Sequence, residues 1–173
     1  MNDITIRRAQ AQDAERLAHI GVATFIDSYT LDIDGDAMVA HCTRQHSREV
    51  YAAYLADPAC SVWLAEYSRT GAPVGYAVNC PPDLPLPLEP GDIELKRIYV
   101  LHRFQGTGTG PRLMEAALED ARQRGAPRLL LGTYEDNHRA IAFYKKNGFD
   151  LAGTRQFQVG ERVYDDIVLA RRL

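Results

Sequence analysis

Three glycines stand at alternate positions in the run from Gln105 to Gly110, which reads Gln-Gly-Thr-Gly-Thr-Gly. Glycine leaves the backbone amides uncovered, whereas side chains at these positions would block the approach of a ligand. Amides that point into a concavity suit a phosphate or pyrophosphate group, above all where the positive end of a helix dipole adds to them. The loop therefore predicts an anion site.

The spacing of Gly106, Gly108 and Gly110 limits the kind of cofactor that this site would hold. A dinucleotide fingerprint needs G-x-G-x-x-G, and the last interval here is one residue too short. A P-loop ends in Gly-Lys-Ser/Thr, but Gly110 is followed by Pro111 and Arg112. The hypothesis of an NAD(P)-dependent oxidoreductase therefore rests on the glycines alone.

A strand before the loop and a helix after it must hold the loop in place. Residues 94–100 are rich in apolar and β-branched side chains, which is typical of a strand. Pro111 suits the first turn of a helix, and the apolar residues of 111–124 recur at helical spacing. A short apolar strand over 128–133 completes a parallel crossover, which places the loop at the carboxyl end of its first strand.

The loop matches the pattern Q/R-x-x-G-x-G/A, and here the chain resembles the GCN5-related N-acetyltransferases, in which this loop holds the pyrophosphate of acetyl-CoA. The run from Asn137 to Phe149 is similar to the second cofactor helix of that family. The resemblance implies an enzyme that transfers an acetyl group from acetyl-CoA to a primary amine. The cofactor-binding residues that it implies are Ile98, Tyr99, Val100, Gln105, Gly106, Thr107, Gly108, Thr109, Gly110, Asn137 and Tyr144.

Two positions depart from the family pattern. Thr109 stands where an aliphatic residue is usual, and Pro111 lacks an amide that could bind phosphate. We expect a somewhat lower cofactor affinity and an intact loop.

Acetyl transfer needs a neutral amine, stabilisation of a tetrahedral oxyanion and a proton for the departing thiolate. The resemblance implies Tyr144 as the general acid, and Asn137 lies about 10 Å from it on the same helix face. Glu94 matches an acidic strand position that some members use as the general base. Glu94 lies roughly 13 Å of strand from Ile98, so a base there would act through ordered water; a structural or substrate-attracting carboxylate is the alternative. Glu135 is the reserve candidate.

The acceptor is predicted less sharply than the cofactor. The segments 94–100, 137–149 and 153–160, with Asp166, look most similar to the polyamine (spermidine/spermine) branch of the family, which favours a small cationic amine. The alternatives are the N-terminus of a protein or peptide, and a non-catalytic acyl-CoA-binding or regulatory module. The acidic residues expected on the acceptor side are Asp27, Asp34, Glu94, Glu135, Asp165 and Asp166.

Composition sets the remaining limits. The 173 residues, 46% hydrophobic, suit a single domain over 1–173, and a net charge of −3 without a basic block argues against a nucleic-acid partner. No apolar run suggests a membrane segment, and Cys42, Cys60 and Cys80 are expected to be three reduced thiols in a cytoplasmic protein. His102 and His138 are expected to be lone surface histidines, and no metal site is predicted.

The patterns predict an α/β (α+β) fold of the acetyltransferase type, with a mixed, mostly antiparallel sheet of six to seven strands and about four helices. The expected order is β-α-α-β-β-β-α-β-α-β-β, with one long helical region over 36–56 and hairpins over 61–79 and 154–170. The segment 81–90 holds five of the nine prolines and is expected to be a loop. It would act as a rigid connector, or as a lid or the contact of a homodimer through Leu84, Leu86 and Leu88.

Overall fold

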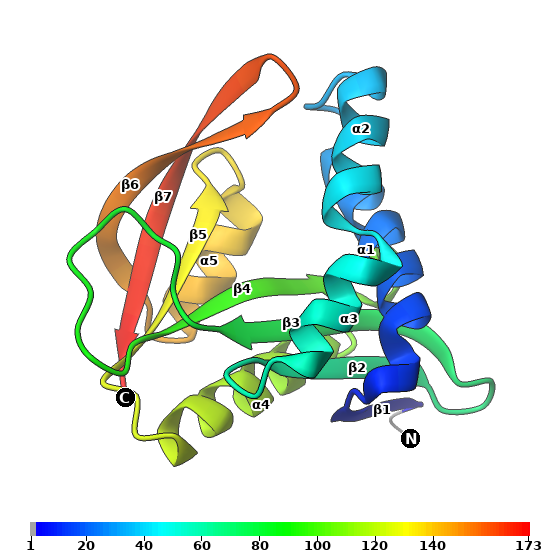
Figure 1. The fold of residues 1–173 in the computed structure, drawn as a ribbon, viewed down its shortest axis with the longest axis horizontal. Helices are drawn as coiled ribbons and strands as arrows, with labels where there is room; N and C mark the ends of the chain where they lie inside the picture. Colours follow the sequence, from blue (N-terminus) through cyan, green and yellow to red (C-terminus); the bar gives the residue numbers. More distant parts are fainter. Residues whose placement is uncertain (1–2) are drawn as a thin grey trace.

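The computed structural model describes residues 3–173 and shows one seven-stranded sheet in the order β1-β2-β3-β4-β5-β7-β6 (Figure 1). All neighbouring strands are antiparallel except β4 and β5. The strands are β1 (Ile4–Arg8), β2 (Ser61–Tyr67), β3 (Ala72–Cys80), β4 (Ile93–Val100), β5 (Arg128–Tyr134), β6 (Asp150–Val159) and β7 (Arg162–Arg172). The mixed, mostly antiparallel sheet is confirmed.

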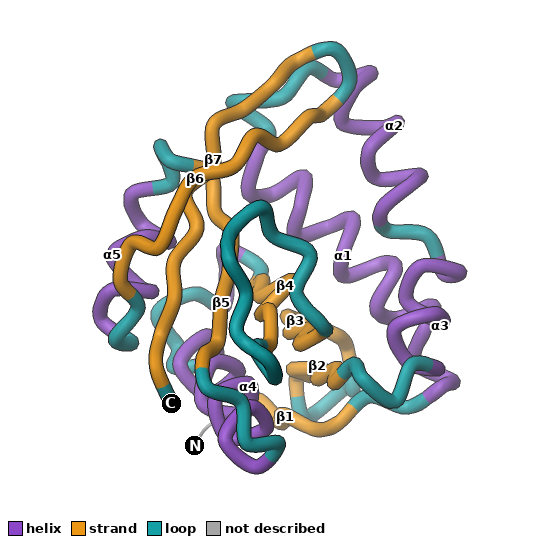
Figure 2. Tube along the Cα trace, turned by 60° about the vertical axis from the view of Figure 1, so that its left-hand side comes forward, coloured by secondary structure: helices purple, strands orange, loops and turns teal. Residues whose placement is uncertain are grey.

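Helices cover both faces of the sheet (Figure 2). The helices are α1 (Ala14–Tyr29), α2 (Gly35–Gln45), α3 (Arg48–Ala56), α4 (Thr109–Gln123) and α5 (His138–Lys146). The apolar side of α4 packs with Tyr144 of α5 and with Phe149 against one face. On the other face, α1 and α3 bury Leu17 and Tyr51, and α2 packs on α1 through Phe25 and Met38. Each helix thus places its apolar stripe on the sheet or on a neighbouring helix.

The helical region predicted over 36–56 is two helices rather than one. His46 ends α2, and the Ser47 hydroxyl accepts a hydrogen bond from the amide of Val50, which makes Ser47 the N-cap of α3. A serine that caps the next turn stabilises a new helix start, because it satisfies an amide that has no partner inside the helix. Residues 3–173 therefore contain five α-helices, where about four were predicted.

Strands β4 and β5 pair only at their beginnings. Ile93 and Glu94 face Leu129 and Leu130, and the pairing stops there, although both strands continue for several residues. On its other side β4 pairs with β3 through Val100, with a bulge at Lys96, which has no partner in β3. The bulge bends β4 and adds twist, so the two strands separate beyond Glu94 and the sheet opens.

The proline-rich loop packs on the opened sheet near β5 and β7. Leu84 is buried with Leu130 and Val168, and Leu86 packs beside them. Leu88 is 43% exposed, which leaves it as the leucine of this loop that a subunit contact could use. The loop is thus anchored to the sheet at its start.

The prediction of three reduced thiols was wrong for two of them. Cys60, just before β2, and Cys80, at the end of β3, form a disulfide, while Cys42 is free and buried. The two cysteines are 20 residues apart in the chain and have no C-x-x-C spacing, so only the antiparallel pairing of β2 with β3 brings them together. No helix in residues 3–173 is long and apolar enough to cross a membrane.

The disulfide predicts a thiol count. Protein purified without reductant and then denatured should give one reactive thiol per chain in a colorimetric titration, from Cys42, and three after reduction. Cys60→Ser is the control, since it frees Cys80 and should give two thiols without reductant. Three thiols in the unreduced wild-type protein would contradict the disulfide.

Candidate functional site

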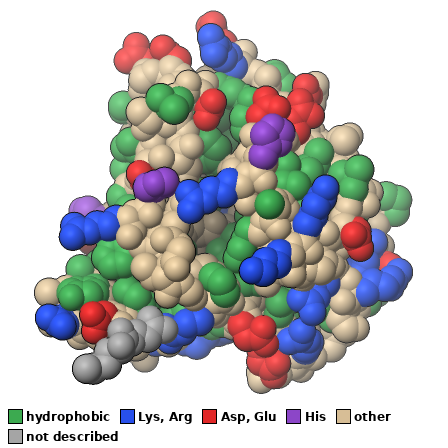
Figure 3. All heavy atoms as spheres, turned by 180° about the vertical axis from the view of Figure 1, so that it is seen from behind, with side chains coloured by type: hydrophobic (Ala, Val, Ile, Leu, Met, Phe, Trp, Pro, Cys, Tyr) green, Lys and Arg blue, Asp and Glu red, His purple; other side chains and the backbone are tan. Residues whose placement is uncertain are grey.

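A cavity of about 970 Å³ lies where β4 and β5 separate. Its walls come from α1 and α2, from the glycine loop and α5, and from the β6–β7 hairpin. Seen from behind, the surface is hollowed near its centre, with Lys and Arg side chains beside the hollow (Figure 3). Because the sheet is open at this point, the cavity joins the side of α4 and α5 to the side of α1 and α3.

The glycine loop presents a row of free amides at the start of α4. In the described part of the chain, no backbone N–H from Gly106 to Gly110 donates to a protein acceptor. Gly106 and Gly108 have φ angles of 80° and 85°, a left-handed conformation that turns the intervening amides to one side. Five free amides at a helix N-terminus suit an anion, and the anion site stays a prediction.

The two departures from the family pattern have separate consequences in the loop. Thr109 is buried, and its hydroxyl lies 2.9 Å from that of Thr107, so it stabilises the loop from inside. Pro111 is the third residue of α4, where its missing N–H breaks no bond within the helix. Neither residue covers the free amides.

The edge of β4 beyond Glu94 is open toward the cavity. Ile98 and Val100 pack their side chains on the core beneath α4 and α5, while Tyr99 points to the opposite face and stacks on Tyr76 at 5.9 Å. Of the predicted cofactor residues on this strand, Tyr99 can therefore offer only its backbone on the α5 side. The Gln105 side chain donates to the carbonyl of Val100 at 3.0 Å and ties the loop to the end of the strand.

Asn137 and Tyr144 lie at the two ends of α5, and both line the cavity. The Asn137 side-chain oxygen accepts from the amide of Ala140 at 3.1 Å, so Asn137 is the N-cap of α5, and its NH₂ group is available for a ligand. This capping role was not predicted.

The Tyr144 side chain is 8% exposed and packs edge-on against Phe143 and Phe149. Its hydroxyl has no hydrogen-bond partner among the described residues. Burial, followed by the nearby Tyr99, raises the pKa of Tyr144 well above its usual value near 10. The phenol is therefore neutral and keeps its proton for a ligand in the cavity.

Glu94 is almost completely buried but lines the cavity. Its Oε2 accepts from the amide of Asp83 at 2.9 Å, with the Lys96 ammonium 3.8 Å away. Its Oε1 has no partner among the residues that the structure describes, and so can accept a proton or a water. The reserve candidate Glu135 is exposed and outside the cavity wall.

Half of the acidic residues expected on the acceptor side lie away from the cavity. Asp34 caps α2 through the amides of Asp36 and Ala37, and Glu135 and Asp165 are exposed elsewhere. Those in the cavity wall are already bonded. Asp27 accepts from the amide of His102 at 2.6 Å, and Asp166 pairs with Arg155 at 3.0 Å.

Sequence reasoning missed a polar aromatic cluster on the side of α1 and α3. Arg97 of β4 donates to the Tyr51 hydroxyl, and His41 and His46 lie beside it. The charged residue Arg97 in the second half of β4 was the available signal, but α2 and α3 supply its neighbours from distant positions in the chain.

The two histidines that flank the glycine loop and α5 in sequence, His102 and His138, are exposed. Among residues 3–173, no three His, Cys, Asp or Glu side chains are grouped to hold a metal ion.

Comparison with known proteins agrees with this geometry. A model described as the acetyltransferase (GNAT) family matches residues 28–149. An uncharacterized N-acetyltransferase of Mycobacterium tuberculosis (strain ATCC 25618 / H37Rv) is 33% identical over 161 residues, covering 93% of this chain and 98% of that protein. The spermine/spermidine N(1)-acetyltransferase of Bacillus subtilis (strain 168) is 32% identical over 74 residues, 42% of this chain and 48% of that protein.

The fold is also found among solved structures. The PaiA N-acetyltransferase of Thermoplasma acidophilum, solved in complex with coenzyme A, superposes with a TM-score of 0.81 at 17% identity over 98% of this chain and 99% of that chain.

The free amides predict the effect of a side chain in the glycine loop. Gly108→Val should raise the Kd for acetyl-CoA about tenfold or more, because a branched residue avoids the left-handed conformation and would project into the concavity. Titration calorimetry on the folded variant measures this. The matched control is Gly71→Val, which puts the same residue at a φ of 70° in the turn between β2 and β3. Equal affinity of Gly108→Val and the wild-type protein would refute the anion site.

Proposed function

Because the chain belongs to the acetyltransferase (GNAT) family and is an N-acetyltransferase that uses acetyl-CoA, we propose that residues 1–173 act as one catalytic domain that acetylates a primary amine of a small molecule. The observation that carries this proposal is that one cavity wall contains both the glycine loop with its free amides and the Tyr144 hydroxyl. Acetyl-CoA availability favours the cytoplasm as the place of this reaction.

We assign the pyrophosphate of acetyl-CoA to the amides of Gly106 to Gly110, where the dipole of α4 adds positive potential. The open backbone edge at Ile98 to Val100 offers hydrogen bonds to an extended arm, as the edge of a sheet does for a peptide. The NH₂ group of Asn137 lies in the same wall. When bound, acetyl-CoA supplies an activated acyl group as its thioester.

In the transfer, the amine nitrogen forms a bond to the thioester carbon, and the bond from that carbon to sulfur breaks. The amine loses one proton and the leaving thiolate takes up one, which gives an amide and free coenzyme A. We assign the first proton to Glu94 through Oε1, by way of ordered water, and the second to the Tyr144 phenol. Burial raises the pKa of Tyr144 above its usual value near 10, so the phenol holds its proton near neutral pH.

Tyr144→Phe tests this function. The variant should keep its affinity for acetyl-CoA and lose about 10- to 1000-fold in kcat, the scale of losing a general acid. The measurement is release of free thiol with a panel of amines, together with cofactor calorimetry. A non-catalytic acyl-CoA-binding module would instead bind acetyl-CoA and release no thiol in response to any amine.

The companion variant Glu94→Gln separates a base from a structural carboxylate. If Glu94 is a base, raising the pH, which increases the neutral fraction of the amine, should restore part of kcat/KM; a structural role predicts a lower melting temperature and no such recovery. An unchanged kcat in Tyr144→Phe with the best acceptor would remove that tyrosine from the mechanism.

A small cationic amine, such as a polyamine, is the acceptor class that the tail of the sequence predicted. The local similarity to the Bacillus subtilis spermine/spermidine N(1)-acetyltransferase supports it. Asp32 and Asp83, both at the cavity wall and without a side-chain hydrogen bond in residues 3–173, could attract such a cation.

This class predicts a salt effect. Exposed charges are screened beyond about 8 Å at physiological ionic strength, so KM for spermidine should rise with salt more than KM for a neutral amine. Initial rates at low and high salt, with an uncharged-tail amine of similar length as control, measure the difference. Spermidine inactivity beside turnover of other amines would end the polyamine hypothesis and leave the acetyltransferase function in place.

A further inference from the structure

Arg97 is an interior cation without a carboxylate partner. Within residues 3–173, no Asp or Glu oxygen lies within 4.0 Å of its guanidinium. Two other arginines whose side chains are largely covered are paired with carboxylates: Arg128 with Asp92, and Arg155 with Asp166. A desolvated cation is costly unless an opposite charge or a set of acceptors compensates it.

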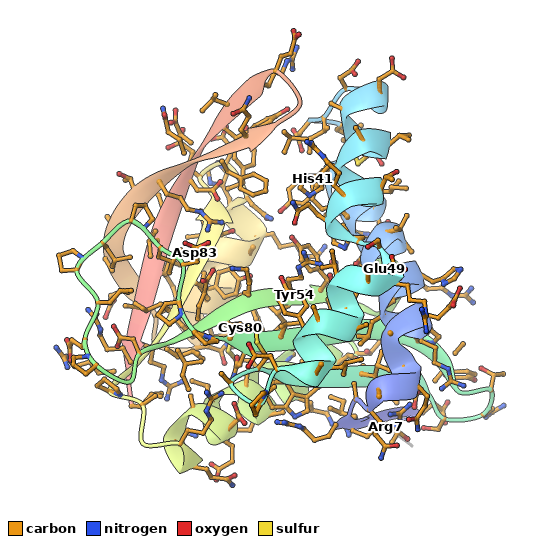
Figure 4. All side chains as sticks on the ribbon, in the orientation of Figure 1. Arg7, His41, Glu49, Tyr54, Cys80 and Asp83 are labelled. Carbon is orange, nitrogen blue, oxygen red and sulfur yellow. A yellow bond between two sulfur atoms is a disulfide. The ribbon has the colours of Figure 1, made fainter. Side chains whose placement is uncertain are left out.

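The surroundings of Arg97 hold it from one side only. Its Nη1 donates to the Tyr51 hydroxyl at 2.7 Å and lies 3.3 Å from Nδ1 of His46. Its guanidinium carbon sits 5.1 Å from the centre of the Tyr51 ring and 5.4 Å from that of Tyr54. Figure 4 shows Tyr54 on α3, near the sheet. The aromatic rings therefore fix the position of the cation without neutralising it.

The remaining N–H groups of Arg97 face the cavity. Nε and Nη2 have no acceptor among the described residues, and Arg97 is part of the cavity wall. Two adjacent N–H groups of a guanidinium match the two oxygens of a carboxylate, which is the geometry of a bidentate pair.

Neighbouring groups do not supply the missing negative charge. Burial, and then the charge of Arg97, lower the pKa of His41 to about 4 and that of His46 to about 3, so both rings are neutral near pH 7. Of the acidic residues in the cavity wall, Glu94 accepts from the Asp83 amide and Asp166 pairs with Arg155, and neither Asp32 nor Asp83 forms an ion pair with Arg97 within residues 3–173.

His41 adds a second polar group without a partner. It is 5% exposed, its ring nitrogens make no hydrogen bond within residues 3–173, and it lines the cavity. Its ring stacks on that of Phe25, with 4.3 Å between the ring centres, and its centre lies 5.8 Å from that of the Phe157 ring on β6. A ligand here would meet a cation, a neutral imidazole and aromatic faces.

We propose that the acceptor is an amine that also carries a carboxylate, as in an amino acid, and that Arg97 binds this carboxylate while the amine reaches into the gap between β4 and β5. Arg97 and Ile98 are neighbours on β4 with side chains on opposite faces, so the carboxylate lies on the side of α1 and α3 and the acetyl donor on the side of α4 and α5. This inference rests on the proposed function and replaces a purely cationic acceptor.

Matched acceptors test the proposal. Amino acids, the corresponding amino-acid amides and the decarboxylated amines are compared in the thiol-release assay with wild-type protein and Arg97→Gln. The amino acids should be preferred by the wild type, and Arg97→Gln should lose about 10- to 100-fold in kcat/KM for them, the scale of a charged bidentate hydrogen bond. The wild type and Arg97→Gln should differ from each other by less than about threefold in kcat/KM for the decarboxylated amines and in the Kd for acetyl-CoA.

The controls keep the outcome decisive. Arg44→Gln removes the same charge from the exposed rim of the cavity, and should change the acid-to-amide preference by less than about twofold. Arg97→Lys keeps the charge but lacks the two adjacent N–H groups of a guanidinium. It should recover part of the preference for acids over amides, which a merely structural role would not give. If Arg97→Gln does not fold, Arg97→Lys alone carries the comparison.

Product binding gives a readout that does not depend on turnover. Calorimetry with the N-acetyl amino acid should show binding to the wild type, at least tenfold weaker binding to Arg97→Gln, and an intermediate affinity for Arg97→Lys. An equal loss of kcat/KM in Arg97→Gln on amino acids and on decarboxylated amines, with the enzyme still active, would overturn the proposal. A preference of the wild type for spermidine over every amino acid would overturn it as well. Acetyl-CoA binding without release to any amine would instead refute the proposed function.

Discussion

The early end of pairing between β4 and β5 is the constraint on which the site depends. Two residue pairs join the strands, at Ile93 and Glu94, and the bulge at Lys96 turns β4 away from β5. An unpaired strand edge inside a protein is normally covered, because its N–H and C=O groups lose water without gaining partners. Here the open edge lines a cavity, and the same opening lets groups from both faces of the sheet meet.

The bulge at Lys96 also decides which β4 side chains face each partner. Before it, Ile93 and Leu95 pack toward α4; after it, Ile98 and Val100 do so, which shifts the alternation by one residue. Glu94 and Arg97, three residues apart, consequently reach the same cavity wall. In a regular strand they would point to opposite faces.

Arginines in the framework of the fold have carboxylate partners, whereas Arg97 in the site has none within residues 3–173. Arg7 bridges Asp13 and Glu66 at the junction of β1, β2 and α1, and Arg128 holds Asp92 at the start of β4, so these charges are compensated within the chain. Arg97 has aromatic and hydroxyl neighbours in place of a carboxylate. The framework therefore needs no ligand, whereas the acceptor side has an uncompensated positive charge.

The sequence by itself determined the local features: the glycine loop, the start of α4 at that loop, the strand hairpins and the fold class. These depend on spacing within a few residues, through φ angles, helix periodicity and strand alternation. Only the tertiary structure decided that Cys60 meets Cys80, that Tyr51 meets Arg97, and that His41 and Arg97 share one cavity wall. Such contacts join residues far apart in the chain, and no periodic pattern specifies them, because strand pairing and helix packing set those distances.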